Sequence, residues 1–289
     1  MLSIVIPVYN YPILPLVERL HQEASTLNIP FEILVCDDAS HSVFDNESIV
    51  QLQHTRLLKN QVNRHVAYTR NRLLAEAQYP WVLLLDADTY PLAANFIQTY
   101  LTQRDQGLFF QGGFTYQSTE KKQTLRLKYG IEIEQHKHIH SCCNLFFNQQ
   151  QLQLQFDESI QTYGYEDTLF FLQVQKRDIA ITRLNNKVAH LSTESNATYL
   201  ERTQQACNVL ATLVLNQTIH PQEIQLSHRY SQLQKSHLTA LLTGIDLLIG
   251  KWITRNLLSE TPSMLLFKLF KLIAYHKAIQ AIQKTKPLL

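Results

Sequence analysis

The sequence predicts an α/β fold built on a mostly parallel sheet, followed by a C-terminal helical extension. Two observations predict it. In the first half of the chain, short apolar runs alternate with helical stretches, which is typical of a parallel sheet covered by helices on both faces. Beyond about Ser195 the pattern is helical throughout. We therefore expect an α/β domain at residues 1–195 and a helical extension at residues 196–289.

The individual elements follow from apolar runs, helical periodicity and turn residues. Runs of four to eight apolar residues predict buried strands. The strands expected are Leu2–Val8, Phe31–Cys36, Arg56–Leu58, Trp81–Leu85, Gly107–Phe114, Asn144–Asn148, Ile179–Leu184 and Lys187–Leu191. The helices expected between them run from Pro12 to about Leu27 and over Arg64–Ala77, Leu92–Gln103 and Asp167–Lys176, while Leu125–His140 is expected to be irregular or extended. The extension is expected to hold helices at Thr198–Leu215, Glu223–Gln234, Leu238–Ile253 and Met264–Ile282.

Composition excludes several classes of protein. The 289 residues include 26 Lys and Arg against 24 Asp and Glu, so the net charge of +2 gives no support to nucleic-acid binding. The first glycine is Gly107, which excludes an early dinucleotide fingerprint or P-loop. The four cysteines form no C-x-x-C pair, which argues against a zinc site or a disulfide framework and suits a reducing cytosol. The opening Leu2-Ser3-Ile4 reads as a first strand and not as a signal peptide.

Acidic clusters stand where strands are expected to end. Asp37-Asp38 follows the second strand, Asp86-Ala87-Asp88 follows Trp81–Leu85, and Glu166-Asp167 opens a later helix. A single carboxylate at such a place is often only a helix cap. Ligand crevices of open α/β sheets, however, lie at the carboxyl ends of the strands. An Asp-x-Asp pair there suits a hard divalent ion that bridges a phosphate-bearing substrate.

These motifs resemble those of glycosyltransferase family 2, the inverting nucleotide-sugar glycosyltransferases with the GT-A fold. The matching segments lie in the family's order along most of the first 200 residues. They are Ser3 to Asn10, Asp37 to Ser40, Asn63 to Asn71, Asp86 to Asp88, Phe156 to Glu158 and Gly164 to Asp167. The chain departs from the family pattern at His65, where glycine is frequent, and at Thr69, where alanine is frequent. The sequence from Glu166 to Phe170, Glu-Asp-Thr-Leu-Phe, resembles that of the galactosyl- and N-acetylgalactosaminyl-transferase branch.

The resemblance assigns roles on the donor side. It implies that Asp37 or Asp38 accepts the uracil N3–H and that Pro7 and Tyr9 wall the base. Asp86 would hold the ribose. Arg70 would contact phosphate or pair with a carboxylate, and both alternatives stay open.

The resemblance also implies a divalent cation, Mn²⁺ or Mg²⁺. Asp88 would be its ligand, and His190 matches a position where related enzymes carry a further one. The alternative for His190 is a solvent-facing or capping histidine. A ligand set of imidazole and carboxylate suits Mn²⁺ better than Ca²⁺.

Inverting transfer needs one base to take the proton of the acceptor hydroxyl. Asp167 is the candidate, with Glu166 as a neighbour that could orient the acceptor. The alternative is that this pair only places negative charge at the start of a helix.

A second cluster has a weaker claim on chemistry. His136, His138 and His140 would share one face of a strand, and Cys142 lies nearby. A zinc site is the less favoured reading, since Lys137 interrupts the set. We expect an exposed or acceptor-lining strand, with Cys142 and Cys143 packed beside Asn144.

The C-terminal helices leave a choice between membrane and protein contact. Met264 to Ile273 combines dense apolar residues with Lys268 and Lys271, and Lys277, Lys284 and Lys286 add positive charge. An interfacial helix on an anionic leaflet would have this composition. The alternative is a helix that packs on the catalytic domain or on a second subunit.

Together these features predict a metal-dependent glycosyltransferase of hexosyltransferase type. Its partners would be a nucleotide-sugar, most readily a UDP-sugar, and a saccharide or lipid-linked acceptor, in bacterial surface polysaccharide synthesis. We expect it in the cytoplasm, with the inner face of the membrane as one location. The alternatives are an inactive nucleotide-sugar-binding scaffold and, less favoured, a nucleotidyltransferase.

Overall fold

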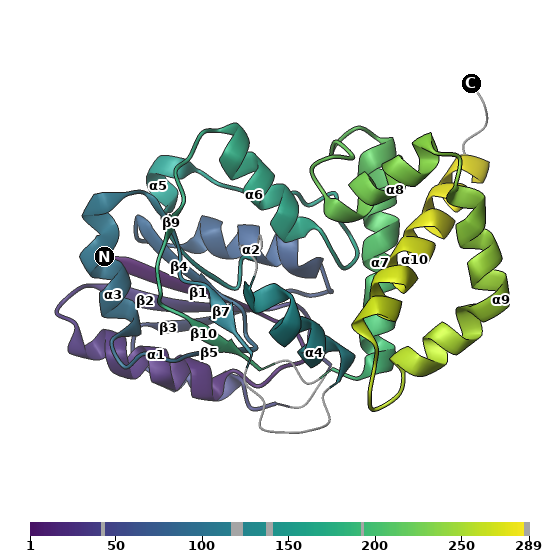
Figure 1. The fold of residues 1–289 in the computed structure, drawn as a ribbon. Coiled ribbons are helices and arrows are strands. Elements are labelled where there is room, and N and C mark those ends of the chain that lie inside the picture. Colours follow the sequence, from purple (N-terminus) through teal and green to yellow (C-terminus); the bar gives the residue numbers. More distant parts are fainter. Residues whose placement is uncertain (42–43, 117–123, 137–140, 192–193, 286–289) are drawn as a thin grey trace. The chain divides into compact units, whose positions relative to one another are not determined.

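The computed structural model describes residues 1–41, 44–116, 124–136, 141–191 and 194–285. The chain forms two compact units (Figure 1). The first comprises Met1–Gln117, Glu134–Gln161 and Glu166–Ser192, and the second comprises Ser118–Ile133, Thr162–Tyr165 and Thr193–Leu289. The second unit thus includes two short segments that precede residue 195. The domain boundary at 195 stays a prediction.

A seven-stranded sheet forms the centre of the first unit, in the order β3-β2-β1-β4-β8-β6-β9. Its members are β1 (Leu2–Val8), β2 (Phe31–Asp37), β3 (Thr55–Lys59), β4 (Trp81–Leu85), β6 (Phe109–Gln111), β8 (Asn144–Asn148) and β9 (Thr182–Arg183). Strands β1 to β4 are mutually parallel, and β8 runs antiparallel to β4 and β6. A smaller sheet has the order β5 (Thr89–Pro91), β10 (Val188–His190) and β7 (Phe114–Thr115). The predicted α/β class with a mostly parallel sheet is confirmed.

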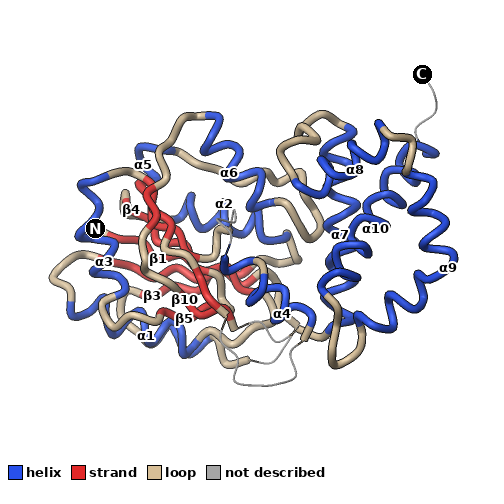
Figure 2. The backbone as a smooth tube through the Cα atoms, in the orientation of Figure 1, coloured by secondary structure: helices blue, strands red, loops and turns tan. Residues whose placement is uncertain are grey.

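Helices cover both faces of the large sheet (Figure 2). Successive strand side chains point to opposite faces, so Ile4 and Ile6 enter one core while Val5 enters the other. Helices α1 (Leu14–Thr26) and α3 (Phe96–Gln103) pack on the first face. Helices α2 (His65–Glu76) and α6 (Glu166–Lys176) pack on the second. Burial on both faces explains why these strands read as continuous apolar runs. The short elements are η1 (Glu47–Gln51), η2 (Arg104–Gln106), η3 (Glu134–His136) and α5 (Gln149–Leu152).

The strand register brings the acidic motifs to one edge of the sheet. Val8 at the end of β1 pairs with Asp37 at the end of β2. Strand β4 is parallel to β1, so Asp86 follows β4 at the same edge. The side chains that follow these parallel strands therefore share the crevice side of the sheet.

Several expected elements differ from the structure. The strand expected at Ile179–Leu184 is reduced to β9 (Thr182–Arg183). Leu125–His140, expected to be irregular or extended, holds helix α4 (Leu125–Glu132) and then η3; residues 137–140 lie outside the described residues. The Thr124 side chain caps α4 by accepting the Leu127 N–H, a local signal for a helix start. The expected strand Gly107–Phe114 is divided into β6 and β7. A side chain at Gly112 would lie 2.0 Å from the Tyr100 hydroxyl, so only glycine fits at the break. The helix expected from Leu92 begins at Phe96, after β5.

The second unit is helical. It contains α4, α7 (Asn196–Leu215), α8 (Gln225–Lys235), α9 (Thr239–Leu257) and α10 (Met264–Thr285). Helix α10 packs against α7, α8 and α9 and supplies much of the apolar core of this unit. None of the described helices combines the length and apolarity that a membrane span requires.

Candidate active site

The loops after β1 and β2 are tied to each other by hydrogen bonds. The Asn10 N–H donates to the Ser40 hydroxyl at 2.8 Å, and the His41 N–H donates to Asn10 Oδ1 at 2.8 Å. Both Asn10 and Ala39 have positive φ, at 52° and 60°. Non-glycine residues adopt this conformation at a cost, and such residues gather at functional sites. Tyr9 is exposed next to these two hydrogen bonds, and its ring lies edge-on to His41. Pro7, in contrast, is buried inside β1.

The two aspartates after β2 differ in exposure. Asp38 is buried, and its Oδ1 accepts hydrogen bonds from Asn60 Nδ2 at 2.6 Å and from the Arg64 N–H at 2.8 Å. These bonds fix the loop between β3 and α2. The Asp37 carboxylate is half-buried and accepts the Ser40 N–H at 2.9 Å. Asp37 is therefore the more accessible of the two.

The start of α2 explains one departure from the family pattern. His65 has φ of 64°, a left-handed conformation that glycine adopts without strain. Thr69 is buried, and its hydroxyl accepts a hydrogen bond from Asn60. Threonine here thus joins the same polar network that holds Asp38.

Arg70 on α2 bridges two of the predicted carboxylates. Its Nη2 donates to Asp86 Oδ1 at 2.7 Å, and its Nη1 donates to Asp167 Oδ1 at 2.6 Å. The guanidinium also lies 5.0 Å from the centroid of the Phe156 ring. Arg70 thus forms ion pairs with two carboxylates, and its contact with a phosphate stays a prediction. Arg70 and Asp167 are 97 residues apart, so no local sequence pattern predicts this contact.

The charged groups of this bridge shift the pKa values of one another. The Arg70 side chain is 3% exposed, while Asp86 and Asp167 are 25% and 23% exposed, so each carboxylate keeps an accessible side. Burial raises the pKa of Asp86; Arg70 opposes that shift, and the charges of Asp167 and Asp88 add to it. Burial by itself would lower the pKa of Arg70, but Asp86 and Asp167 outweigh it and hold that pKa well above its usual value.

Asp167 has both carboxylate oxygens oriented by the protein. Its Oδ1 accepts from Arg70, and its Oδ2 accepts the Cys142 N–H at 2.8 Å. Glu166 lies next to it at the start of α6. Burial raises the pKa of the Cys142 and Cys143 thiols well above the usual value, which does not suit a nucleophile. All four cysteines are free and buried.

Asn71, next to Arg70, holds the loop that precedes α6. Its Nδ2 donates to the Phe156 carbonyl and to Glu158 Oε1, and its Oδ1 accepts the Phe156 N–H at 2.7 Å. Two adjacent residues of α2 thus contact both parts of the Phe156–Asp167 region. Asn71 is a functional residue without a predicted role, and its place directly after Arg70 in the motif is the sequence signal for it.

Asp88 and His190 lie side by side. Asp88 Oδ2 is 3.6 Å from His190 Nδ1. Strand pairing produces this contact, because His190 in β10 pairs with Thr89 in β5 and the Leu191 N–H donates to the Asp88 carbonyl. The Tyr116 ring stacks on His190 at 5.0 Å between centroids, a contact that the sequence did not suggest.

The histidine cluster does not form a metal site within the described residues. His136 is exposed in η3, and His138 and His140 lie outside the described residues. In the part of the chain that the structure describes, no group of three or more His, Cys, Asp or Glu side chains could hold a metal by itself. Asp88 and His190 are a pair, so a cation there would need further ligands from a substrate.

A comparison with protein families matches residues 3–153 to Glycosyl transferase family 2. The chain belongs to this family. The match includes the loops after β1 and β2, the Arg70 helix and the Asp86-Ala87-Asp88 turn. The protein is thus a nucleotide-sugar glycosyltransferase. The comparisons do not confirm the galactosyl and N-acetylgalactosaminyl branch suggested by the sequence.

Solved structures agree with the fold. A fragment of Staphylococcus aureus TarS, residues 1–349, is similar with a TM-score of 0.51 and 16% identity, over 100% of this chain and 93% of that one. The mannosyltransferase PcManGT from Pyrobaculum calidifontis, in complex with GDP-Man and Mn²⁺, is similar with a TM-score of 0.54 and 14% identity, over 99% of this chain and 88% of that one. No curated protein sequence matches the chain.

The Arg70 bridge predicts a large stability loss for Arg70→Met. In this variant Asp86 and Asp167 stay partly buried but lose the Arg70 guanidinium with which both form ion pairs. Removal of one partner from a buried ion pair costs about 3–5 kcal/mol. Denaturant unfolding followed by circular dichroism measures the change.

Arg56→Met is the matched control. Arg56 pairs with Glu76 at 2.9 Å, but both side chains are well exposed. Loss of an exposed pair costs about 1 kcal/mol or less. Equal losses in the two variants would contradict the central role of Arg70.

Proposed function

We propose that this glycosyltransferase moves a hexose from a UDP-sugar to an acceptor hydroxyl, with inversion at the anomeric carbon and with the help of a divalent cation. The observation that best supports the proposal is the Asp86–Arg70–Asp167 bridge. It brings a donor-side carboxylate and a candidate base to the same guanidinium, although Asp86 and Asp167 lie 81 residues apart in the chain.

The donor base would bind at the loops after β1 and β2. Tyr9 presents an exposed ring, and Pro7 would lie behind it as a buried residue of β1. Asp37 is the better candidate for the uracil N3–H, because Asp38 is buried and already accepts two hydrogen bonds. Asp86 would hold the ribose with the side of its carboxylate that Arg70 leaves accessible.

Asp88 and His190 fit a divalent cation. Their atoms are 3.6 Å apart, a separation that allows one ion to bind both. A carboxylate and an imidazole suit Mn²⁺, and Mg²⁺ is the second candidate. When bound, the ion would neutralise negative charge on the diphosphate leaving group. PcManGT contains Mn²⁺ together with its nucleotide-sugar, which supports this choice.

Asp167 would act as the general base. The acceptor oxygen attacks the anomeric carbon, its proton passes to Asp167, and the bond from that carbon to the diphosphate oxygen breaks. Arg70 and the Cys142 N–H fix the orientation of the carboxylate. Glu166, at the first position of α6, would orient the acceptor.

The acceptor proposed is a saccharide or a lipid-linked saccharide, in the synthesis of a bacterial surface polysaccharide. The sequence from Glu166 to Phe170 supports a donor that carries galactose or N-acetylgalactosamine. A cytoplasmic location at the inner face of the membrane would suit a lipid-linked acceptor.

Asp167→Asn tests the base. We expect donor binding to be kept and transfer to fall by at least about 10²-fold, the low end of what a general base contributes. UDP release from UDP-sugars measures turnover, and calorimetric titration with UDP and Mn²⁺ measures binding.

The control is Asp178→Asn, an exposed aspartate just beyond α6. It should leave turnover unchanged. Near-normal transfer by Asp167→Asn would refute the assignment, and Glu166→Gln tested in parallel would show whether its neighbour takes the proton.

Metal-dependent donor binding tests the Asp88–His190 pair. We expect UDP to stabilise the protein far more with Mn²⁺ than with chelator. A ligand at a hundred times its Kd adds about 2.7 kcal/mol to the free energy of unfolding. Thermal unfolding measures the effect, and Asp88→Asn and His190→Gln should each abolish the Mn²⁺-dependent part.

Equal stabilisation of the wild type with Mn²⁺ and with chelator would contradict a metal at this pair. Stabilisation by a nucleoside triphosphate in place of UDP would instead favour a nucleotidyltransferase. His54→Gln, at a loop remote in sequence from both ligands, is the matched histidine control.

A further inference from the structure

Several exposed apolar side chains lie along one side of α9, and Leu247, which is 81% exposed, lies outside this group. Leu248 is 85% exposed, Leu241 58% and Trp252 57%. Their spacings of seven and four residues place them on the same side of the helix, with the exposed Ile249 beside them. We call Leu241, Leu248, Ile249 and Trp252 the α9 strip.

The other side of α9 is occupied by the core of its own unit. Leu242, Ile253 and Leu257 are buried there. The side chains of the α9 strip therefore do not take part in the packing of α9 against its own unit. Large contiguous exposed apolar patches usually mark an interaction surface.

Helix α10 differs from α9 in how its apolar residues are packed, and of the two alternatives left open by the sequence the structure favours protein packing. Met264 to Ile273 has the composition of an interfacial helix, but Met264, Phe267, Phe270 and Ile273 are buried. They pack against neighbouring helices of the second unit. On α10 the strongly exposed apolar side chain is Leu265, so the larger exposed apolar surface is on α9.

Positive charge accompanies the strip. Lys251 and Arg255 are exposed on α9 and follow one another by one turn along the edge of the strip. From residue 225 onward the basic residues are Arg229, Lys235, Lys251, Arg255, Lys268, Lys271, Lys277, Lys284 and Lys286, and the acidic ones are Asp246 and Glu260. The chain as a whole is nearly balanced, at 26 basic against 24 acidic residues, so the excess is specific to this region.

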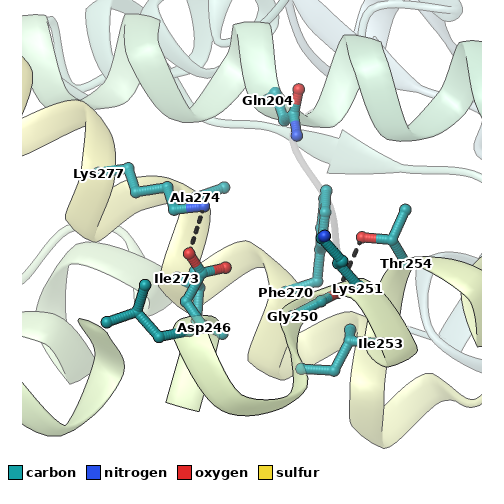
Figure 3. A pocket seen from close by; sticks show the side chains of 11 residues that line it. Gln204, Asp246, Gly250, Lys251, Ile253, Thr254, Phe270, Ile273, Ala274 and Lys277 are labelled. Atoms are coloured by element: carbon teal, nitrogen blue, oxygen red, sulfur yellow. Dashed lines mark hydrogen bonds and ion pairs between the residues drawn. The ribbon is translucent and has the colours of Figure 1, made fainter. Parts of the chain in front are cut away.

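A cavity between α9 and α10 lies beside these charges (Figure 3). Its volume is about 520 Å³, and Lys251 and Lys277 are among its lining residues. Lys277 forms an ion pair with Asp246 at 2.6 Å. Lys251 forms no ion pair with the residues that the structure describes. The Lys251 ammonium is thus available to an anion next to the strip.

We propose that the α9 strip docks the protein on an anionic lipid bilayer. Leu241, Leu248 and Trp252 would enter the headgroup region, and Lys251 and Arg255 would contact lipid phosphates. Apolar burial combined with basic residues at its edge is the arrangement by which helices bind in the plane of such a surface. Since no described helix can span a bilayer, the contact would be peripheral.

Charge decides between a bilayer and a second copy of this chain. A symmetric contact through the strip would bring two strongly basic regions together, each with Lys251 and Arg255 at its edge. An anionic leaflet instead complements them. The inference uses the second unit alone, so it can fail without affecting the proposed transfer reaction.

Vesicle flotation tests the inference directly. The full chain, without donor or acceptor, is mixed with vesicles of phosphatidylcholine containing phosphatidylglycerol, or of phosphatidylcholine alone. We expect flotation with the anionic vesicles and at least about tenfold weaker binding to the neutral ones. Raised salt should weaken the anionic binding, because salt screens exposed charges.

Two double variants separate the apolar and the basic contributions. Leu248→Ser with Trp252→Ser should reduce binding at least about tenfold, and Lys251→Gln with Arg255→Gln should remove the preference for anionic vesicles. These side chains are exposed, so both proteins should fold, which thermal unfolding checks. Val50→Ser, at a similarly exposed valine in η1, is the control and should bind like the wild type.

Tryptophan fluorescence reports the depth of the contact. The chain contains two tryptophans, Trp81 and Trp252. Trp81 packs on Phe146 inside the first unit, so a blue shift with vesicles would arise from Trp252. Trp252→Phe should keep the binding and lose the shift.

Absence of flotation with anionic vesicles would overturn the proposal, as would flotation that the strip variants do not change. Dimers that the Leu248→Ser, Trp252→Ser variant converts to monomers, without vesicle binding, would assign the strip to a second copy instead. UDP binding with Mn²⁺, measured on the same variants, should equal that of the wild type. If the wild type did not bind UDP with Mn²⁺, that result would count against the proposed function and not against membrane docking through the α9 strip.

Discussion

A buried guanidinium determines the geometry of the candidate site. Arg70 is almost fully removed from solvent, and the desolvation of its charge is offset only because two carboxylates share it. One follows β4 and the other lies in the first turn of α6. Helix α2 must therefore pack where its side chain reaches both. Asn71 holds the loop before α6 from the next position on the same helix, so this short stretch of α2 aligns the two halves of the site.

Rigid surroundings allow this polar group to be buried. Strands β1, β2 and β4 fill both faces of the sheet with apolar side chains, so their ends are fixed in register. The loops at those ends then adopt costly conformations, with positive φ at Asn10, Ala39 and His65. Hydrogen bonds accepted by the Ser40 hydroxyl and the Asp38 carboxylate secure these loops. The loops on the ligand side of the sheet thus combine backbone strain with polar networks, while the strands that hold them are packed by apolar side chains.

Sequence reasoning succeeded where the pattern was local. Continuous apolar runs gave the strands of the parallel half, and the Asp-rich turns marked the edge where they end. It failed where a tertiary contact overrides the local pattern. The Gly107–Phe114 run divides at Gly112 and Gly113, where Gly113 has φ of 76° and where Tyr100 and Asn144 leave no space for a side chain at Gly112. Leu125–Glu132 is a helix: the Thr124 cap is a local signal for its start, but its packing in the second unit is not visible in its own residues.

The sequence by itself determined the fold class, the family motifs and the acidic residues at strand ends, because periodicity and short spacings are properties of adjacent residues. Only the tertiary structure decided that Arg70 binds Asp86 and Asp167, that Asp88 meets His190 across paired strands, and that α9 and not α10 carries an exposed apolar side. Each of these depends on contacts between residues distant in the chain, and such contacts follow from packing and register, which no local pattern encodes.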